Sequence, residues 1–411
     1  MQELNSHPEY NGNPFSYLLE LSGRSSGAVI LPPVSRVGQG SYGTPYQGGA
    51  PDRYTADQLP YFHRDRLIPT MRRAYDIMLE GVLARKDEVT IEGLSADDLF
   101  EVAYAVHYDH PELYWFYWIT VVGNTTVRLR YGASEEEVAM LNERMEAVIP
   151  KFLEGIDDTM SAYDVAVRIH ARVIEHTDYD KVALAAEKAA GGPEKDTIDY
   201  LRTICGVFLN GKAVCQGYAR AVQYLLQRCG VECAECAGHT VPKPGKKPGA
   251  HSWNIIKMDG EYYYSDTTWD DSSDTIQTVK NTDVGYDFFG VTTEEISRSR
   301  NFDLCPVEMP DCTATKCNYY VHNGLAFESY DKAVMRELAS KAAERKEAFF
   351  AFKCLNEQLF RQMDEERTAS GSLYFDAIKA AAKADSRIDP RSFRSHSDAR
   401  VRTVTISFNY K

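Results

Sequence analysis

Residues 210–230 read NGKAVCQGYARAVQYLLQRCG and contain the most informative local pattern of the chain. Asn210-Gly211 indicates a turn, and from Cys215 onward apolar residues recur at helical spacing until Gly230 ends the pattern. Cys215 is therefore predicted in the first turn of a helix. Unpaired backbone N–H groups and the positive end of the helix dipole favour a thiolate there, and can donate to an oxyanion. Most single cysteines are small buried residues, so Cys215 becomes a candidate nucleophile only with partners.

A second stretch, HSWNIIKMDGEYYYSDTTWDD at residues 251–271, alternates on both sides of Asp259-Gly260. That dipeptide is typical of a two-residue β-hairpin turn. The turn fixes the pairing register, which places His251 opposite Thr268 and diagonal to Asp266 on the same face. Diagonal neighbours lie within reach of a side-chain hydrogen bond.

Taken alone, His251 reads as a polar residue at the start of a strand and Asp266 as a turn carboxylate at the end of one. Their shared face favours a different interpretation. A carboxylate that accepts from one imidazole nitrogen fixes the tautomer and leaves the other nitrogen to take a proton from Cys215. The three residues together predict a thiol nucleophile with its base and orienting acid.

The segments GKAVCQGYARAVQYLL, HSWNII and DGEYYYSDTTWDD together resemble the transglutaminase-like superfamily, whose core is related to papain-like cysteine proteases. The order Cys, His, Asp fits, as do the spacings of 36 and 15 residues. YDFFGVTTEEISRSRNFDLCP and NYYVHNGLAFESYDKA look like the downstream part of bacterial members. The resemblance covers residues 140–330 and implies an α+β fold in which the helix bearing the cysteine packs on an antiparallel sheet.

The resemblance implies that Cys215 is the nucleophile, His251 the general base and then acid, and Asp266 the orienting carboxylate. The Cys215 backbone N–H and Tyr179, in HTDYD, are the candidates for the oxyanion hole, although Tyr179 could equally be a tyrosine that caps the core. The implied activity is acyl transfer on peptide or protein amides through a thioester, with hydrolysis favoured. Transfer to an amine, as in protein-glutamine transglutaminases, is one alternative. A catalytically silent binding or scaffold protein on the same fold is another.

The chain lacks the β-sandwich domains and the recognisable calcium loop of the animal crosslinking enzymes, so no cofactor or metal is expected. Cys229, Cys233 and Cys236 have the spacing of a radical enzyme's iron–sulfur site. VECAECAG reads as a strand, however, and residues three apart on a strand face opposite sides. A zinc site could also be drawn from cysteines 305, 312 and 317 with His322, but the spacing is irregular.

The formal net charge of −14 over 411 residues argues against binding to nucleic acid or anionic lipid. No basic-then-apolar leader opens the chain and no 18 apolar residues run together, so the sequence predicts no membrane insertion. A cytoplasmic protein is expected from the sequence as it stands, or an exported one if a signal was removed. Nine unevenly spaced cysteines fit a reducing compartment. The oligomeric state is open.

Composition shifts divide the chain into four parts: an extended arm over residues 1–57, an α+β segment over 58–135, the catalytic domain over 136–330 and an α+β appendage over 331–411. Periodicity predicts helices over residues 65–83, 95–107, 134–155, 158–176 and 331–346, and strands over 348–354 and 401–410.

Overall fold

The computed structural model describes residues 52–55, 58–192, 194–242, 247–271, 284–367, 369 and 371–411. The arm predicted for residues 1–57 therefore lies almost wholly outside the described residues. The chain forms two compact units. Unit 1 contains the residues up to Thr268 together with Arg300–Asp311, and unit 2 contains Trp269–Ser299 together with Cys312–Lys411.

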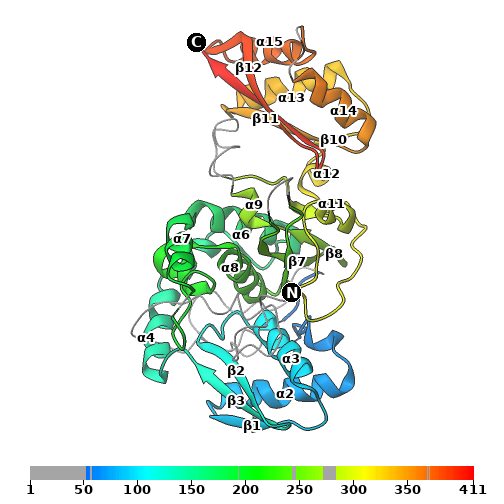
Figure 1. The fold of residues 1–411 in the computed structure, drawn as a ribbon. Coiled ribbons are helices and arrows are strands. Elements are labelled where there is room, and N and C mark those ends of the chain that lie inside the picture. Colours follow the sequence, from blue (N-terminus) through cyan, green and yellow to red (C-terminus); the bar gives the residue numbers. More distant parts are fainter. Residues whose placement is uncertain are drawn as a thin grey trace. The chain divides into compact units, whose positions relative to one another are not determined.

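Unit 1 begins with helices and a small antiparallel sheet of strand order β1-β3-β2 (Figure 1). Gly123, with a φ of 64°, lies in the turn between β2 and β3, and Ser95 and Asp98 form the capping box that starts α3. The predicted helix over 65–83 is a 3₁₀ turn followed by an α-helix that begins at a proline. The elements are η3 (Arg64–Arg66), α2 (Pro69–Leu83), β1 (Glu88–Thr90), α3 (Ala96–Asp109), β2 (Phe116–Val122) and β3 (Thr126–Tyr131).

The continuous helix predicted for residues 134–155 is wrong, because the chain forms two helices, α4 (Glu135–Glu146) and α5 (Ile149–Leu153). Pro150 explains the break. It has no backbone N–H to donate, and its ring would clash with the carbonyl four residues earlier in a continuous helix. The next predicted helix is confirmed as α6 (Ala162–His176).

The central part of unit 1 packs helix α8 (Cys215–Arg228) on strands β6 (Cys233–His239), β7 (Ala250–Met258) and β8 (Glu261–Ser265). Both neighbouring strand pairs are antiparallel, and the amide of Asn254 on β7 donates to the Ala219 carbonyl of α8 over 2.9 Å. This buried bond fixes β7 against α8. The fold is therefore α+β, with the cysteine-bearing helix on an antiparallel sheet as predicted.

The predicted hairpin register is confirmed, since Asn254 pairs with Ser265 and both turn residues, Asp259 and Gly260, have positive φ. The predicted pairing of His251 with Thr268 is wrong. Strand β8 ends at Ser265, and helix α9 (Thr267–Asp270) begins two residues later. His251 pairs with Gly238 of β6, on the other edge of β7.

Gly238 is a position where only glycine fits, because a Cβ there would overlap the carbonyl of Asn301. We expect Gly238→Ala to lower the free energy of unfolding by about 1–3 kcal/mol, since β6 and the Asn301 segment must separate. Urea titration checks this. Gly249→Ala is the matched control, because its new methyl would meet nothing closer than Thr240 Oγ1 at 3.8 Å. Equal losses for the two variants would contradict the argument.

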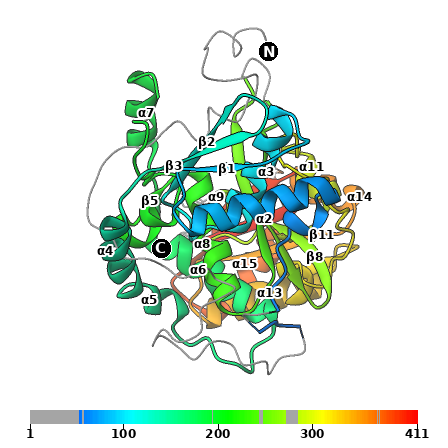
Figure 2. The same ribbon diagram turned by 90° about the horizontal axis from the view of Figure 1, so that it is seen from below.

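The remaining elements of unit 1 lie between α6 and α8 in the sequence. Strands β4 and β5 pair in parallel, and helix α7 has no fully buried residue and lies at the periphery of unit 1 (Figure 2). A turn of π-helix precedes β5. The bounds are β4 (Asp178–Tyr179), α7 (Lys181–Ala189), η4 (Gly206–Asn210) and β5 (Lys212–Ala213).

Unit 2 is built on a sheet of order β10-β11-β13-β12 with helices α13, α14 and α15 around it (Figure 1). Its core is apolar and includes Phe352, Met363, Ile378 and Ile406. The predicted helix over 331–346 and the predicted strands over 348–354 and 401–410 are present. The elements are β9 (Phe289–Val291), α11 (Thr293–Ser297), α12 (Tyr319–His322), β10 (Ala326–Phe327), α13 (Lys332–Glu344), β11 (Phe349–Cys354), α14 (Glu357–Glu366), α15 (Tyr374–Ala384), β12 (Ile388–Asp398) and β13 (Thr403–Tyr410).

Within the described ranges, no helix is both long and apolar enough to cross a lipid bilayer. All nine cysteines are free thiols. The four-part division of the chain made from its composition stays a prediction.

Candidate active site

Cys215 is the first residue of α8, as its sequence position predicts. The preceding residue, Val214, is extended and places no side-chain cap on the helix, so the first-turn N–H groups are not claimed by a capping side chain. Cys215 is 8% exposed, and its side chain therefore lies at the edge of the core rather than deep within it.

The imidazole of His251 meets the carboxylate of Asp266, with 2.7 Å between Nε2 and Oδ2. His251 is 5% exposed and Asp266 is fully buried. Because Asp266 occupies Nε2, Nδ1 is the nitrogen that remains for the Cys215 thiol. The structure thus brings together the three residues singled out in the sequence.

Burial by itself raises the pKa of the Cys215 thiol, but three other groups outweigh it and lower the pKa. They are the charge and hydrogen bond of His251, the backbone N–H of Ser252, and the charge of Arg202. Burial lowers the pKa of His251, whereas the neighbouring Cys215 opposes that effect. A thiol and an imidazole that stabilise each other's charged forms are the basis of an activated thiolate.

Tyr179 lies beside the Cys215 backbone because β4 pairs with β5, which runs directly into α8. Asp178 N–H donates to the Gly211 carbonyl over 2.8 Å, and Asp180 N–H to the Ala213 carbonyl over 3.0 Å. The Cys215 backbone N–H lies close enough to the Tyr179 hydroxyl to lower the pKa of that hydroxyl. Burial raises the pKa of Tyr179 well above its usual value, so the hydroxyl keeps its proton and can donate it.

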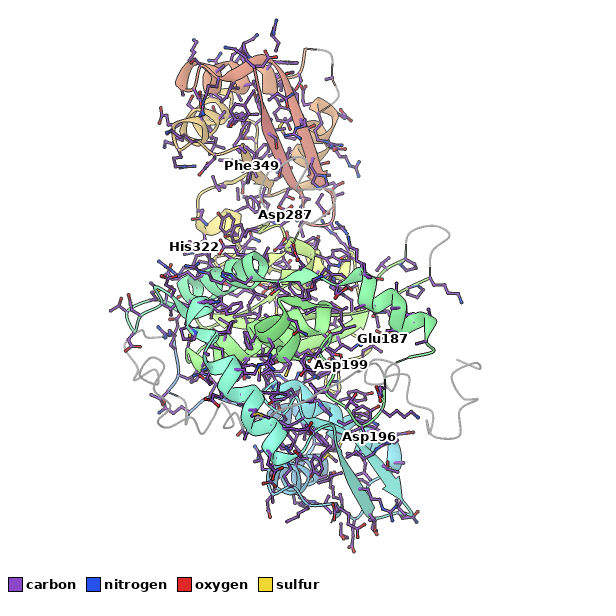
Figure 3. All side chains as sticks on the ribbon, turned by 90° about the vertical axis from the view of Figure 1, so that its left-hand side faces the viewer. Glu187, Asp196, Asp199, Asp287, His322 and Phe349 are labelled. Atoms are coloured by element: carbon purple, nitrogen blue, oxygen red, sulfur yellow. The ribbon has the colours of Figure 1, made fainter. Side chains whose placement is uncertain are left out.

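Arg202 is a cation near Cys215 for which the sequence offers no signal. Its guanidinium donates to both carboxylate oxygens of Glu187, at 2.8 and 3.0 Å, and to Asp199 Oδ2 at 3.1 Å. Figure 3 shows these two carboxylates close together in unit 1. Burial raises the pKa of Asp199 to about 6 in spite of Arg202. The loop holding Arg202 reaches α8 because Leu201 accepts from the Val214 N–H over 2.9 Å.

Arg300 is the second charged residue that sequence reasoning missed. Its Nη1 donates to Asp266 Oδ2, and both side chains are fully buried. The guanidinium also lies over the indole of Trp253, 5.4 Å from the ring centroid. Arg300 belongs to the segment ISRSRNFDL, and nothing in that pattern distinguishes it from a surface arginine.

The alternative cysteine sites gain no support. Cys229 caps the end of α8, while Cys233 and Cys236 sit three residues apart on β6, as predicted. In the part of the chain that the structure describes, no three His, Cys, Asp or Glu side chains gather in a way that could hold a metal ion.

A sequence model described as the transglutaminase-like superfamily matches residues 150–267, a span that contains Cys215, His251 and Asp266. No curated protein matches the chain.

Three solved structures resemble parts of the chain at low identity. The first is a transglutaminase, TGase, with 15% identity and a TM-score of 0.27, covering 38% of this chain and 44% of that one. The second is a provisionally assigned cysteine protease of Cytophaga hutchinsonii, with 13% identity, a TM-score of 0.22 and coverages of 31% and 38%. The third is a provisionally assigned protease of Parabacteroides distasonis, with 10% identity, a TM-score of 0.20 and coverages of 36% and 34%. The chain thus spans less than half the length of each. The predicted resemblance is confirmed by the family match, which identifies a transglutaminase-like domain at residues 150–267.

Proposed function

We propose that this protein is a cysteine-dependent acyl-transfer enzyme that acts on amide bonds of peptides or proteins, with hydrolysis as its main outcome. The observation that carries the proposal is the approach of three side chains from three separate elements. Cys215 starts α8, His251 lies on β7, and Asp266 follows β8, 2.7 Å from the imidazole. A buried cysteine and histidine whose pKa values depend on each other are typical of functional sites.

In the proposed reaction the Cys215 thiolate attacks the carbonyl carbon of the amide and forms a tetrahedral oxyanion. The C–N bond then breaks, and the leaving amine takes a proton from His251, so that a thioester remains on Cys215. Water attacks the thioester while His251 accepts its proton. The products are a carboxylic acid and the regenerated thiol. Asp266 keeps the imidazole oriented throughout and stabilises its charged form.

The oxyanion would be stabilised by two donors that already lie next to one another. The Cys215 backbone N–H lies close enough to the Tyr179 hydroxyl to lower its pKa, although burial outweighs this effect. When an oxyanion enters between them, the hydroxyl can turn and donate, because its raised pKa keeps it protonated.

Hydrolysis and transfer share the same thioester and differ in what resolves it. Transfer to a protein amine needs a binding groove for the acceptor and exclusion of water. No observation in the described residues favours such a groove, so hydrolysis is the stronger candidate. A catalytically silent scaffold has no specific support either. All three proposed catalytic residues are present, with His251 bonded to Asp266 and lowering the pKa of Cys215.

The test is to incubate the protein with an unfolded protein substrate in the presence of a fluorescent primary amine. New N-termini measured by mass spectrometry report hydrolysis, and incorporation of the dye reports transfer. Cys215→Ala is the control and should give neither. If the wild type also gives neither, and its Cys215 is alkylated no faster than an ordinary exposed thiol, the scaffold interpretation replaces this one.

Tyr179→Phe separates the oxyanion role of this residue from a packing role. We expect acylation of Cys215 by an activated ester to slow by about 10²–10³-fold, since one oxyanion donor is lost. Alkylation by iodoacetamide should change little, because displacement at a saturated carbon forms no oxyanion. The two rates are measured on the same preparation. A parallel fall in both rates would show that the hydroxyl merely supports the structure around Cys215.

A further inference from the structure

Asp266 Oδ2 accepts two charged donors at once, His251 Nε2 at 2.7 Å and Arg300 Nη1. We propose that Arg300 is a positioning residue of the acyl-transfer site, which holds the Asp266 carboxylate in place for His251 and balances the charge of the buried assembly. This inference rests on the proposed function of Cys215. It adds a fourth member that neither the sequence motif nor the family match identifies.

Charge balance is the first argument for this role. Cys215 is 8% exposed, His251 is 5% exposed, and Asp266 and Arg300 are fully buried. In the reactive state these four side chains are a thiolate, an imidazolium, a carboxylate and a guanidinium, so their charges cancel. Without Arg300 the other three side chains would carry a net charge of −1 away from water, which is unfavourable.

The backbone around Arg300 shows how the side chain is delivered to Asp266. Arg300 forms an isolated antiparallel bridge with Thr240, and the Asn301 N–H donates to the His239 carbonyl over 3.0 Å. The side chain of Asn301 accepts from the His239 N–H over 2.8 Å. These bonds attach the Arg300 segment to the end of β6, the strand whose Gly238 pairs with His251. The same strand therefore fixes both donors to Asp266.

Trp253 lies beside both donors to Asp266, His251 and Arg300. Its ring lies 6.0 Å from the imidazole of His251, with 22° between the ring planes, and 5.4 Å from the guanidinium carbon of Arg300. Trp253 is 1% exposed. An indole in contact with both groups restricts how either can turn, and its face attracts the guanidinium.

The electrostatic effect of Arg300 on His251 supplies a measurable signature. Burial lowers the pKa of His251 first, Cys215 opposes this effect, and the Arg300 charge lowers the pKa further. Loss of the charge should therefore let the imidazolium persist to higher pH. The charged and titratable groups around His251 are Cys215, Asp266 and Arg300 directly, His170 through its contact with Thr267, and Tyr179 and Arg202 through Cys215.

The experiment measures the pH dependence of the reaction of Cys215 with 2,2′-dipyridyl disulfide, located by mass spectrometry. This probe distinguishes a thiolate paired with imidazolium from a free thiolate. The plot of rate against pH therefore has two sloping parts, or limbs: a lower one for the proton of Cys215 and an upper one for the proton of His251. In Arg300→Gln we expect the upper limb, which reports His251, to move to higher pH by about one unit, a tenfold change in proton affinity. Arg300→Lys keeps the charge and should return the limb most of the way to its wild-type position.

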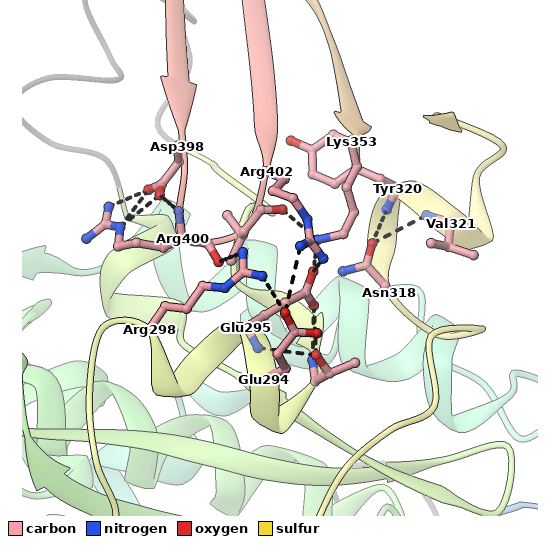
Figure 4. Close-up of polar contacts among 12 residues, drawn as sticks. Glu294, Glu295, Arg298, Asn318, Tyr320, Val321, Lys353, Asp398, Arg400 and Arg402 are labelled. Carbon is pink, nitrogen blue, oxygen red and sulfur yellow. Dashed lines mark hydrogen bonds and ion pairs between the residues drawn. The ribbon is translucent and has the colours of Figure 1, made fainter. Parts of the chain in front are cut away.

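Lys353→Met is the matched control for the loss of a buried ion pair. Lys353 bonds Glu295 over 2.6 Å in unit 2, and both side chains are almost fully buried (Figure 4). This variant should lower the melting temperature without moving either limb. An Arg300→Gln profile that superimposes on the wild type would overturn the role assigned to Arg300. A wild-type profile with no pH range in which Cys215 reacts as a thiolate paired with imidazolium would instead contradict the proposed function on which that role depends.

A second measurement applies if Arg300→Gln does not fold. The double variant Asp266→Asn with Arg300→Gln lacks both the Asp266 carboxylate and the guanidinium that donates to it. If Arg300 serves to balance Asp266, the double variant should melt at a higher temperature than Asp266→Asn alone. A lower melting temperature in the double variant would show that Arg300 stabilises the fold independently of Asp266, and would overturn the proposal.

Discussion

Replacing His251 with alanine is expected to slow the alkylation of Cys215 by iodoacetamide at pH 7 by about 10- to 100-fold. The substitution removes the largest of the effects that lower the thiol pKa. Burial, which raises that pKa, is then opposed only by the Ser252 N–H and the Arg202 charge, so the midpoint of the alkylation profile should move to higher pH. An ordinary thiol is only a few per cent thiolate at neutral pH, and the greater nucleophilicity of a more basic thiolate recovers part of the loss. The rate is measured across pH, with the labelled cysteine identified by mass spectrometry.

His107→Ala is the matched control for this prediction. His107 is also buried in unit 1, at 3% exposure, and its ring stacks on Phe116 with 4.6 Å between centroids. Its removal should cost stability without shifting the alkylation midpoint of Cys215. If the two variants shifted the midpoint equally, activation by His251 would have to be abandoned in favour of a general loosening of unit 1.

The parts of the site that sequence could predict are those set by local signals. Asp259-Gly260 specifies a two-residue turn, the turn specifies the register, and the register brings His251 near Asp266. Asn210-Gly211 and the apolar repeat place Cys215 at the start of α8 in the same local way. Only the predicted end of the hairpin is wrong. The alternating pattern continues in the sequence after Ser265, whereas the backbone forms helix α9 there.

The two arginines of the site could not be predicted because their partners are distant in sequence. Arg300 meets a carboxylate 34 residues away, and Arg202 meets Glu187 15 residues away in addition to Asp199, three residues away. The two longer contacts follow no helical or strand period. A charged residue whose burial depends on tertiary packing looks the same in sequence as one that remains in water.

Strand β12 was missed for a different reason. Its residues IDPRSFRSHSD are polar and include Pro390, and neither feature is typical of a strand. The strand lies at the edge of its sheet, where a missing N–H is tolerated, and a register shift separates Ile388 from Phe393. Pairing with β13, rather than its own composition, makes it a strand.

Asp266→Asn is expected to lower the free energy of unfolding of unit 1 by about 3–5 kcal/mol, although it changes a single atom. The substitution removes the negative charge that accepts from the fully buried Arg300, and breaking a buried ion pair by neutralising one partner costs far more than breaking a surface pair. It also removes the acceptor that fixes the His251 tautomer, so labelling of Cys215 should slow as well.

Urea unfolding followed by far-UV circular dichroism measures the stability. Asp303→Asn is the matched control, because Asp303 pairs with His239 at 3.0 Å where both side chains are partly exposed, and its loss should cost no more than about 1 kcal/mol. Similar losses for the two variants would mean that Asp266 and Arg300 do not depend on each other, and would remove the electrostatic argument for a four-residue site.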